Sequence, residues 1–421
     1  MLMFIKKFIP TKIFNTLSPT YHRMLVVFGI LVYRQPSKKI KIAAVTGTKG
    51  KSSVCEFINS ILESSGQKTA LASTIRFKIG DENNANKLKM TMPGRFFMHR
   101  FLRKAVNSKC DWAIIEMTSE GTKQFRHIGI HIDALVFTNI AREHIEAHGS
   151  FEKYVEAKFK IGNSLVKSKK RPRLIVANED DEYGTDFLSL KVEESYPYGL
   201  DYAKPYSTDE EGSVMTFMGV NIASPIPGTF TISNMLAAAV FAKAIQVDMD
   251  HIKTGLENVT LIPGRVERVD EGQDFDVVVD YAHTVESLES LYQAFPRKKK
   301  ICVLGNTGGG RDTWKRPKMA AVAEKYCEEV ILTNEDPYDE DPKAIIDEMA
   351  GGMNEKPKII MDRKSAINAA ISSATKSDVV LITGKGTDPY IMEANNKKTP
   401  WSDSKVAREE LKNIIERADT I

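Results

Sequence analysis

A strand–loop–helix signal near the amino terminus constrains this chain more than any other feature. The apolar, β-branched run Ile42–Val45 predicts a buried strand, and a short loop containing Gly47 and Gly50 follows it. Ser52 then opens an amphipathic helical pattern that reaches Leu62. Because such a loop and helix start aim several backbone N–H groups at one point, the segment favours a bound phosphate.

The residues of this loop suggest the chemistry of a nucleotide site. Lys51 would reach the β- and γ-phosphates, and the Ser52 hydroxyl would ligate Mg²⁺. A full P-loop has one more glycine, where this chain has Val45. Gly-Lys-Ser also occurs by chance in ordinary strand–turn–helix units, but the flanking strand and helix favour the phosphate site.

Composition limits the class of protein. With 421 residues, 42% hydrophobic and 27% charged, the chain is typical of a globular protein of two or three domains. A net charge of +4 gives no case for nucleic-acid binding. The cysteines form no C-x-x-C pair, so we expect buried free thiols in a reducing cytoplasm. They are Cys55, Cys110, Cys302 and Cys327.

Residues 1–39 form a basic, apolar arm. Its longest apolar run, Met24–Tyr33, is too short to span a bilayer, and no small-residue cleavage site follows it. Pro10, Pro19 and Pro36 divide the arm into short helical pieces. We expect the arm to pack on the body of the protein, and peripheral contact with an anionic membrane is the alternative. Its basic residues are Lys6, Lys7, Lys12, His22, Arg23, Arg34, Lys38 and Lys39.

The rest of the chain alternates strands and helices, which predicts an α/β fold with mainly parallel sheets. We expect a P-loop-containing central domain at 40–262 and a smaller, Rossmann-like C-terminal domain at 263–421, joined near Pro263-Gly264. The expected strands are 40–45, 111–117, 133–139, 173–178, 275–280, 300–305, 329–333, 358–361 and 378–383. The expected helices include 52–65, 94–107, 151–166, 231–245 and 404–417.

Polar residues after the predicted strands are candidates for a metal site. Glu116 ends the strand 111–117, where ligands of parallel sheets bind, and its carboxylate suits Mg²⁺. His144 follows the next strand, and Lys158 lies within the helix 151–166. Each has a plain structural alternative: an acid in solvent, a structural histidine or a lysine on a solvated helix face.

Taken together, the motifs resemble the Mur ligase superfamily of ATP-dependent amide ligases. Within it they are most similar to the MurE type, which adds the third residue of the peptidoglycan stem peptide. The resemblance is carried in unbroken order by 47–53, Thr91-Met-Pro93, 116–119, 138–144, 156–158, 228–238, 263–265, 280–288, 309–312, 315–317, 384–386 and 406–409.

The resemblance implies a role for each matching residue. ATP and Mg²⁺ would be the cofactors, with Lys51, His144 and Lys158 catalytic and Lys158 carbamylated. The nucleotide would contact Gly47, Thr48, Lys49, Gly50, Lys51, Ser52, Ser53, Asn234, Arg265, Asp280 and His283. The metal would contact Ser52, Glu116, His144 and Lys158. A muramyl-peptide acceptor would contact Thr91, Thr118, Gln124 and Arg126. The amino acid would contact Arg311, Glu335, Asp336, Tyr338, Gly384 and Asp388.

Two departures from the family pattern concern the substrates. Only 46 residues precede Gly47, so the family's UDP-binding N-terminal domain is missing or reduced here, and the acceptor could instead be lipid-linked. Enzymes that select diaminopimelate show Asp-Asn-Pro-Arg where this chain has Glu335-Asp-Pro-Tyr338. The acids at 335, 336 and 339–341 favour a cationic amino acid such as lysine. Alternatively, they form a helix-capping loop before Pro342.

Smaller departures are Glu120, Glu143 and Val285, where the family has His, Asp and Pro. Two other functions stay open: a ligase similar to folylpolyglutamate synthase, which also lacks the UDP-binding domain, and a nucleotide-binding partner protein without activity. For the ligase we expect an acyl-phosphate intermediate, a monomer and a cytoplasmic location. Closure of the two domains would exclude water from that intermediate.

Overall fold

The structure is a computed structural model and describes residues 24–143 and 145–418. It divides the chain into two compact units. The described part of the first comprises residues 24–141, 152–199 and 236–255, and that of the second comprises 142–143, 145–151, 200–235 and 256–418. The domain boundaries that we expect at 39/40 and 262/263 stay a prediction.

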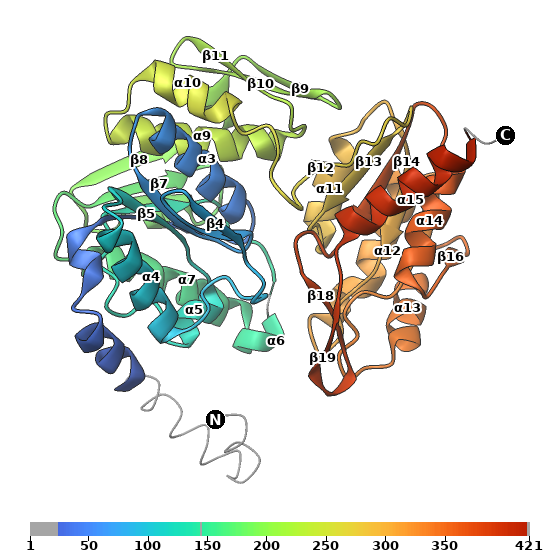
Figure 1. The fold of residues 1–421 in the computed structure, drawn as a ribbon, viewed down its shortest axis with the longest axis horizontal. Helices are drawn as coiled ribbons and strands as arrows, with labels where there is room; N and C mark the ends of the chain where they lie inside the picture. Colours follow the sequence, from blue (N-terminus) through green and yellow to red (C-terminus); the bar gives the residue numbers. More distant parts are fainter. Residues whose placement is uncertain (1–23, 144, 419–421) are drawn as a thin grey trace, which may run out of the picture. The chain divides into compact units, whose positions relative to one another are not determined.

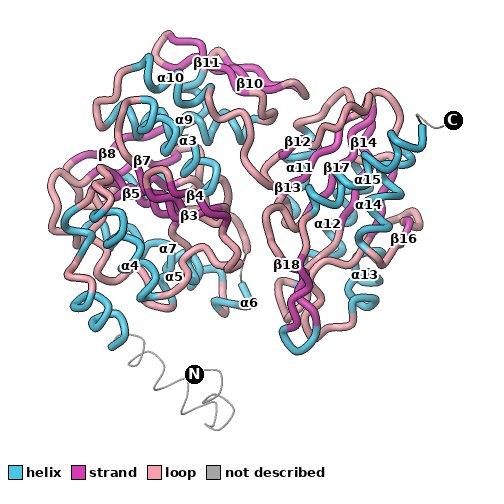
Figure 2. Tube along the Cα trace, in the orientation of Figure 1, coloured by secondary structure: helices cyan, strands magenta, loops and turns pink. Residues whose placement is uncertain are grey.

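An eight-stranded sheet forms the frame of the first unit (Figures 1 and 2). Its strands are β1 (Lys41–Thr46), β2 (Thr69–Ala72), β3 (Arg76–Ile79), β4 (Glu82–Ala85), β5 (Trp112–Glu116), β6 (Ala134–Phe137), β7 (Leu174–Asn178) and β8 (Glu194–Tyr198). Their order is β4-β3-β2-β5-β1-β6-β7-β8, and only the β2–β3 and β3–β4 pairs are antiparallel. Val45 lies opposite Glu116 and Thr46 opposite Phe137, so the ends of β1, β5 and β6 share one edge.

Helices cover both faces of this sheet, with α3 and α9 on one side and α4 and α7 on the other (Figure 1). The helices are α3 (Lys51–Ser64), α4 (Arg95–Asn107), α5 (Ser119–Lys123), α7 (Phe151–Val166), α8 (Gly184–Leu188) and parts of α9 (Thr229–Ala244) and α10 (Met249–Glu257). Tyr154, Ile161 and Leu165 are buried along one face of α7, as its helical spacing predicts.

The second unit contains a six-stranded sheet of order β12-β13-β17-β14-β15-β16, parallel except for β12. Its strands are β12 (Glu267–Arg268), β13 (Asp276–Asp280), β14 (Lys299–Leu304), β15 (Glu329–Leu332), β16 (Lys358–Ile359) and β17 (Asp378–Thr383). Its helices are α6 (Ile145–His148), α11 (Val285–Gln293), α12 (Arg316–Tyr326), α13 (Pro342–Ala350), α14 (Arg363–Ser373) and α15 (Asp403–Ala418). Valines and isoleucines of β13, β14 and β17 pack against α14 and α15 in one apolar core. The predicted α/β class is therefore confirmed.

The strands that the sequence analysis missed are mostly short, exposed or antiparallel. They include β2–β4, β8, β12, a three-stranded sheet of β9 (Tyr206–Asp209), β10 (Gly212–Phe217) and β11 (Val220–Ser224), and the pair β18 (Tyr390–Glu393) and β19 (Lys397–Pro400). All four residues of β4 are exposed, so its sequence shows no apolar alternation. Whether such segments form strands depends on backbone pairing with a neighbour and not on their side-chain pattern.

The described part of the arm packs on the first unit. Residues 24–32 are helical and a 3₁₀ turn, η1, covers Pro36–Lys39. Val26 is 1% exposed, and the Ser37 hydroxyl donates to the Gly129 carbonyl at 2.9 Å. Residues 1–23 lie outside the described residues. Among the helices described here, none is long and apolar enough to cross a membrane.

The cysteines correct one expectation. Cys302 on β14 and Cys327 after α12 form a disulfide, whereas we expected four free thiols. Cys55 and Cys110 are free and buried as expected. Because β14 and β15 are neighbours in the sheet and Cys327 lies just before β15, the fold brings together two cysteines that are 25 residues apart. Sequence spacing alone does not reveal that contact.

Candidate active site

The loop after β1 is held tightly against the loop after β6. The Thr48 N–H donates to the Asn139 carbonyl at 2.7 Å, and the Thr138 hydroxyl donates to the Lys49 carbonyl at 2.7 Å. Gly47 has a φ of +150°, and a Cβ there would lie only 1.8 Å from the Thr138 hydroxyl oxygen. The close approach of these two loops therefore requires a glycine at position 47.

Lys51 and Ser52 lie where this loop becomes helix α3. Gly50 caps the helix in a left-handed conformation with a φ of +80°. The Lys51 ammonium group donates to the Thr48 carbonyl at 2.7 Å, so it lies over the loop. The N–H groups at the start of α3 and the Lys51 charge are together suited to bind an anion.

A buried carboxylate faces this anion site. Glu116, at the end of β5, is 2% exposed, and its Oε2 accepts hydrogen bonds from the Ser52 hydroxyl at 2.9 Å and the Thr74 N–H at 2.8 Å. The Thr74 hydroxyl donates to Oε1 at 3.0 Å and lies 2.7 Å from the Thr91 hydroxyl. The network thus joins the predicted nucleotide, metal and acceptor residues. Sequence analysis missed Thr74, because the strand β2 before it was not predicted; the short buried run Thr69–Ala72 was the signal that could have found it.

Lys158 is buried against the loop after β1. It is 2% exposed, and its ammonium group donates to the Gly47 carbonyl at 2.6 Å. Its Nζ also lies 4.8 Å from the centre of the Tyr154 ring, whose hydroxyl is 2.8 Å from that of Thr48. Lys158 is therefore not on a solvated helix face but is buried against the loop after β1. His144 lies outside the described residues.

The predicted acceptor residues lie around α5. The Thr118 hydroxyl caps this helix by accepting from the Gly121 N–H at 3.1 Å. Arg126 is 8% exposed, and its guanidinium group donates to the Met92 carbonyl and the Gln124 side chain. Met92 follows Thr91, so the structure brings all four predicted acceptor residues into one region of the first unit.

His127, the next residue, gives a testable pH dependence. Burial, and then the positive charges of Lys160 and Lys167, lower its pKa to about 4. In the unfolded chain His127 has its ordinary pKa of about 6.5 and binds a proton below that pH, whereas the folded chain keeps it neutral down to about pH 4. The free energy of unfolding is therefore highest above about pH 6.5 and falls between about pH 6.5 and 4. We expect a loss of at most about 3 kcal/mol, measured by urea unfolding across that range. His127→Gln should flatten this part of the profile, whereas His251→Gln, on the exposed surface, should not.

In the second unit, three predicted nucleotide residues lie close together. Asp280 ends β13 and accepts from the backbone N–H groups of Val266 at 2.7 Å and Ala282 at 2.6 Å. Burial raises the pKa of Asp280, while the charge of Arg265 and these hydrogen bonds oppose the rise. The Arg265 guanidinium group lies 4.4 Å from the centre of the Tyr281 ring.

His283 and Asn234 complete the nucleotide residues predicted in this unit. His283 Nε2 lies 2.7 Å from Glu143 Oε1, and its Nδ1 lies 2.6 Å from the Tyr281 carbonyl oxygen. Asn234 lies in α9 and is 9% exposed. The structure brings Asp280, Arg265 and His283 together around Tyr281, which sequence analysis did not select.

The acidic segment after β15 is largely engaged by the chain itself. Asp336 is 2% exposed and accepts from the Lys385 ammonium group at 2.8 Å. Asp339 accepts from the Asn395 N–H, and Asp341 caps α13. Glu340 accepts from Arg316 at 2.8 Å. Four of the five acids therefore have partners within the chain, and of these only Asp341 caps a helix, as the alternative of a helix-capping loop expected.

Glu335 differs from its four neighbours. It is 3% exposed, and its Oε1 accepts from the Thr307 hydroxyl at 2.8 Å. Its Oε2 is buried and has no hydrogen-bond partner among the described residues. A Cβ on Gly384 would lie 2.3 Å from that oxygen, so the glycine leaves space beside the carboxylate. Such an oxygen is ready to accept from a cationic ligand.

The other predicted amino-acid residues form two groups. The Arg311 guanidinium group lies 5.4 Å from the centre of the Tyr338 ring and donates to its hydroxyl at 3.4 Å. Asp388 Oδ2 lies 3.7 Å from the Lys385 ammonium nitrogen, so it belongs with Asp336. Lys385, 0% exposed between these two carboxylates, was missed, although it lies within the Gly-Lys-Gly motif.

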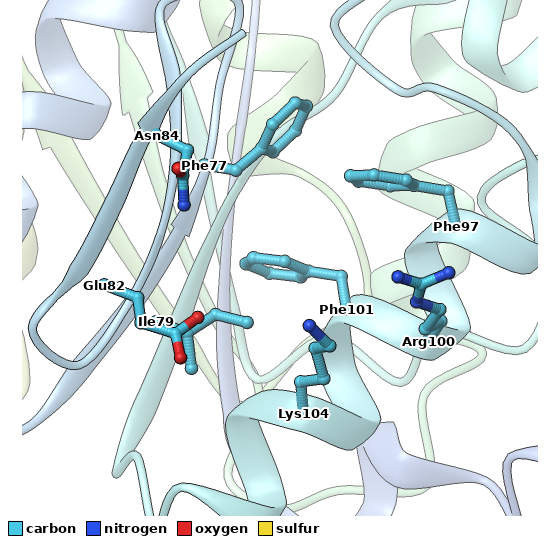
Figure 3. Close-up of a pocket in the computed structure, with 8 residues that line it drawn as sticks. All are labelled: Phe77, Ile79, Glu82, Asn84, Phe97, Arg100, Phe101 and Lys104. Atoms are coloured by element: carbon cyan, nitrogen blue, oxygen red, sulfur yellow. The ribbon is translucent and has the colours of Figure 1, made fainter.

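A further hollow of about 210 Å³ lies between the β3–β4 hairpin and α4. Figure 3 shows Phe97 and Phe101 of α4 projecting toward Phe77 of β3, with Arg100 and Lys104 on the same helix. The Phe77 and Phe97 rings lie 4.8 Å apart. No predicted site residue lines this hollow.

The site in the first unit fits a magnesium nucleotide. The Ser52 hydroxyl and the Glu116 carboxylate are hard oxygen donors of the kind that Mg²⁺ prefers, and they lie beside the anion site of α3. A magnesium ion completes its coordination with phosphate oxygens and water, so two protein ligands suffice. The described residues contain no group of three or more acidic, histidine or cysteine side chains suited to a metal.

Comparisons with known proteins show the family of this chain. The Mur ligase middle domain model matches residues 45–242, and the model described as "Mur ligase, glutamate ligase domain" matches residues 264–386. The chain belongs to the Mur ligase family. It is accordingly an ATP-dependent, ADP-forming amide ligase.

Two relatives of this Mur ligase are similar over most of their length. A UDP-N-acetylmuramoyl-L-alanyl-D-glutamate–2,6-diaminopimelate ligase of Bacillus cereus is 33% identical over 406 residues, which is 92% of this chain and 82% of the relative. The enzyme of the same name from Syntrophomonas wolfei is 34% identical over 414 residues, covering 94% and 83%.

Solved structures show the same fold. A structure of a UDP-N-acetylmuramoyl-L-alanyl-D-glutamate–2,6-diaminopimelate ligase matches with a TM-score of 0.59 and 26% identity, covering 89% of this Mur ligase and 79% of that chain. A folylpolyglutamate synthase of Mycobacterium tuberculosis matches with a TM-score of 0.70 over 87% and 93%, but at 14% identity it shows the fold alone.

Proposed function

We propose that this Mur ligase joins an amino acid, lysine, to the free carboxylate of a muramyl peptide in peptidoglycan precursor synthesis. The observation that carries the proposal is the buried Ser52–Glu116 pair beside Lys51 on the phosphate loop. The names of the relatives support a muramyl-peptide acceptor.

The reaction needs an activated acyl group, because a carboxylate is too poor an electrophile to react with an amine at neutral pH. We propose that a carboxylate oxygen of the acceptor attacks the γ-phosphorus of ATP, and the bond to the ADP oxygen breaks. The amine nitrogen of the amino acid then attacks the resulting acyl phosphate. Phosphate leaves, the nitrogen loses a proton, and an amide forms.

The residues of the first unit would divide this work between them. The backbone N–H groups of the loop and α3 would bind the phosphates, and Lys51 would offset charge on the transferred phosphoryl group. Ser52 and Glu116 would hold Mg²⁺, which supplies Lewis-acid stabilisation of phosphoryl oxygens. Thr91, linked to Glu116 through Thr74, would place the acceptor beside this centre.

Lysine is favoured over diaminopimelate by two features of the second unit. The position that carries an arginine in diaminopimelate enzymes is Tyr338 here, and its ring lies against Arg311. The buried, unpartnered Oε2 of Glu335 suits an ammonium group. We keep the acceptor's carrier open between UDP and a lipid, and we propose a monomer that acts in the cytoplasm.

The test of this proposal is phosphate release from ATP with UDP-N-acetylmuramoyl-L-alanyl-D-glutamate and one amino acid at a time. The panel contains lysine, diaminopimelate, ornithine and glutamate, with folate and glutamate as a separate arm. Lysine-dependent release with an amide product of matching mass would support the proposal. Release only with folate and glutamate, or with diaminopimelate, would contradict it.

Tyr338→Arg is the matching specificity variant. It restores the arginine of the diaminopimelate motif, so kcat/KM for diaminopimelate should rise relative to that for lysine by about tenfold, the value of one charge-assisted pair. Tyr338→Phe keeps the ring and should leave the ratio of the two amino acids unchanged. An equal ratio in Tyr338→Arg and the parent protein would show that position 338 does not read the distal carboxylate.

Lys158 provides a separate prediction. If a carbamate on Lys158 supports the chemistry, removing CO₂ from the buffer should lower kcat and bicarbonate should restore it. Lys158→Met should lower kcat by about 10²-fold or more, in line with the loss of one electrostatic contact, and bicarbonate should not rescue it. Lys160→Arg, on an exposed part of the same helix, is the control. Parent activity that ignores CO₂ would exclude the carbamate.

A further inference from the structure

The helix of residues 24–32 has one face that is packed and one that is open. On the packed face, Val26 is 1% exposed and Gly29 lies against Phe96 and His99 of α4. The Arg103 guanidinium group of α4 donates to the Tyr33 carbonyl at 3.0 Å just after this helix. The helix, dark blue in Figure 1, is therefore fixed on the first unit with a defined orientation.

The outer face of this helix, as we call its open side, is apolar. It consists of Met24 at 66% exposed, Val27 at 55%, Phe28 at 58%, Leu31 at 67% and Val32 at 51%. Their spacing of three and four residues places them in a single stripe. Of the twelve exposed large hydrophobic side chains among the described residues, five lie in this one helix, so the stripe is a concentrated patch and not scatter.

The sequence around the outer face is strongly basic. Residues 1–55 contain ten Lys and Arg residues and no Asp or Glu. The whole chain has a net charge of +4, so residues 56–421 carry a net −6 and the positive charge belongs to this end. Arg34, Lys38 and Lys39, which follow the helix, are all exposed. The α4 helix beneath it contains no acid and adds Arg100 and Lys104.

We propose that the outer face docks on an anionic lipid bilayer and holds this ligase at a membrane surface. An apolar stripe can insert among the acyl chains of such a bilayer, and the basic residues that flank it can contact the anionic headgroups. A second copy of the chain is a poorer occupant, because it would bring the exposed Arg34, Lys38 and Lys39 of one copy toward the same residues of the other. Contact is peripheral, and it does not depend on which acceptor or amino acid the ligase uses.

Flotation of the full chain with vesicles tests this directly. We expect it to float with phosphatidylcholine vesicles that contain phosphatidylglycerol, to float poorly with phosphatidylcholine alone, and to be released by salt. Leu31→Glu should weaken binding at least tenfold. Met218→Glu also replaces an exposed apolar side chain by Glu, at a residue that is 62% exposed in the β10–β11 turn, and this variant should bind as the parent does.

A charge variant tests the second part of the surface. The double variant Lys38→Gln with Lys39→Gln should bind anionic vesicles about thirty-fold more weakly, at the usual contribution of each basic residue near such a surface. Lys397→Gln with Lys398→Gln removes an exposed Lys-Lys pair elsewhere and should bind like the parent. Far-UV circular dichroism and urea unfolding show that each variant is folded.

Several results would overturn the inference. They are no flotation of folded protein, binding to neutral and anionic vesicles alike, and parent-like binding by Leu31→Glu. Sedimentation without vesicles gives another: a dimer that Leu31→Glu converts to a monomer would assign the outer face to a second copy. Because flotation requires no turnover, failure of the proposed reaction leaves this test unaffected.

Discussion

Lys51→Ala should abolish most of the ligase activity, with kcat falling by about 10²–10³-fold. The Lys51 ammonium group lies over the loop after β1, 2.7 Å from the Thr48 carbonyl oxygen, at the start of α3. Removing it leaves the charge on the transferred phosphoryl group without that stabilisation. The measurement is single-turnover formation of ADP together with the equilibrium binding of ATP.

The comparison of kcat with binding decides what Lys51 does. A loss mainly in kcat indicates stabilisation of the transition state, and an equal loss in ATP affinity indicates ground-state binding. Lys191→Ala, an exposed lysine of the first unit, should behave as the parent. Full activity in Lys51→Ala would show that the loop after β1 is not the phosphate site of this chain.

Glu116→Gln should have the second large effect, about 10²-fold or more in kcat, with a higher requirement for Mg²⁺. The Gln side chain can keep the hydrogen-bond network: its oxygen accepts from Ser52 and from the Thr74 N–H, and the Thr74 hydroxyl can accept from its amide. The substitution therefore removes the negative charge and little else, and the free energy of unfolding should change by less than about 1 kcal/mol.

A magnesium titration of phosphate release, with urea unfolding of the same samples, measures both effects. Glu82→Gln, an exposed acid on β4, is the matched control and should leave the magnesium dependence unchanged. If Glu116→Gln had the parent's magnesium dependence, Glu116 would be an acceptor of structural hydrogen bonds and not a metal ligand. A large loss of stability with normal activity per folded molecule would lead to the same conclusion.

Most of the parallel strands and the long helices were predictable because their patterns are local. The strand β1, the helix α3 and the helix α7 each show the spacing of their buried residues in the sequence. The strands β4 and β9 could not be predicted, because their side chains are exposed or mixed and backbone pairing with a neighbour forms them. The disulfide of Cys302 escaped prediction for a similar reason, since it depends on which strands are neighbours.

The candidate site shows the same division. A motif could select Lys51, Ser52 and Glu116, since each follows a strong strand signal. It could not show that Thr74 joins Glu116 to Thr91, nor that Lys158 lies behind Gly47. The acids after β15 are the clearest case. Their sequence suggests a site for a cation, but in the structure Lys385, Arg316 and the start of α13 bind three of them.

The sequence by itself therefore determined the α/β class, the family and the residue types of the site, because buried periodicity and ordered motifs are properties of the chain. The tertiary structure alone decided which of those residues meet, since the edge shared by β1, β5 and β6 depends on strand order and register. It also decided that Glu335 keeps an unpartnered oxygen and that the helix at 24–32 leaves an apolar face open. Burial and pairing are properties of the folded molecule, and no single segment contains them.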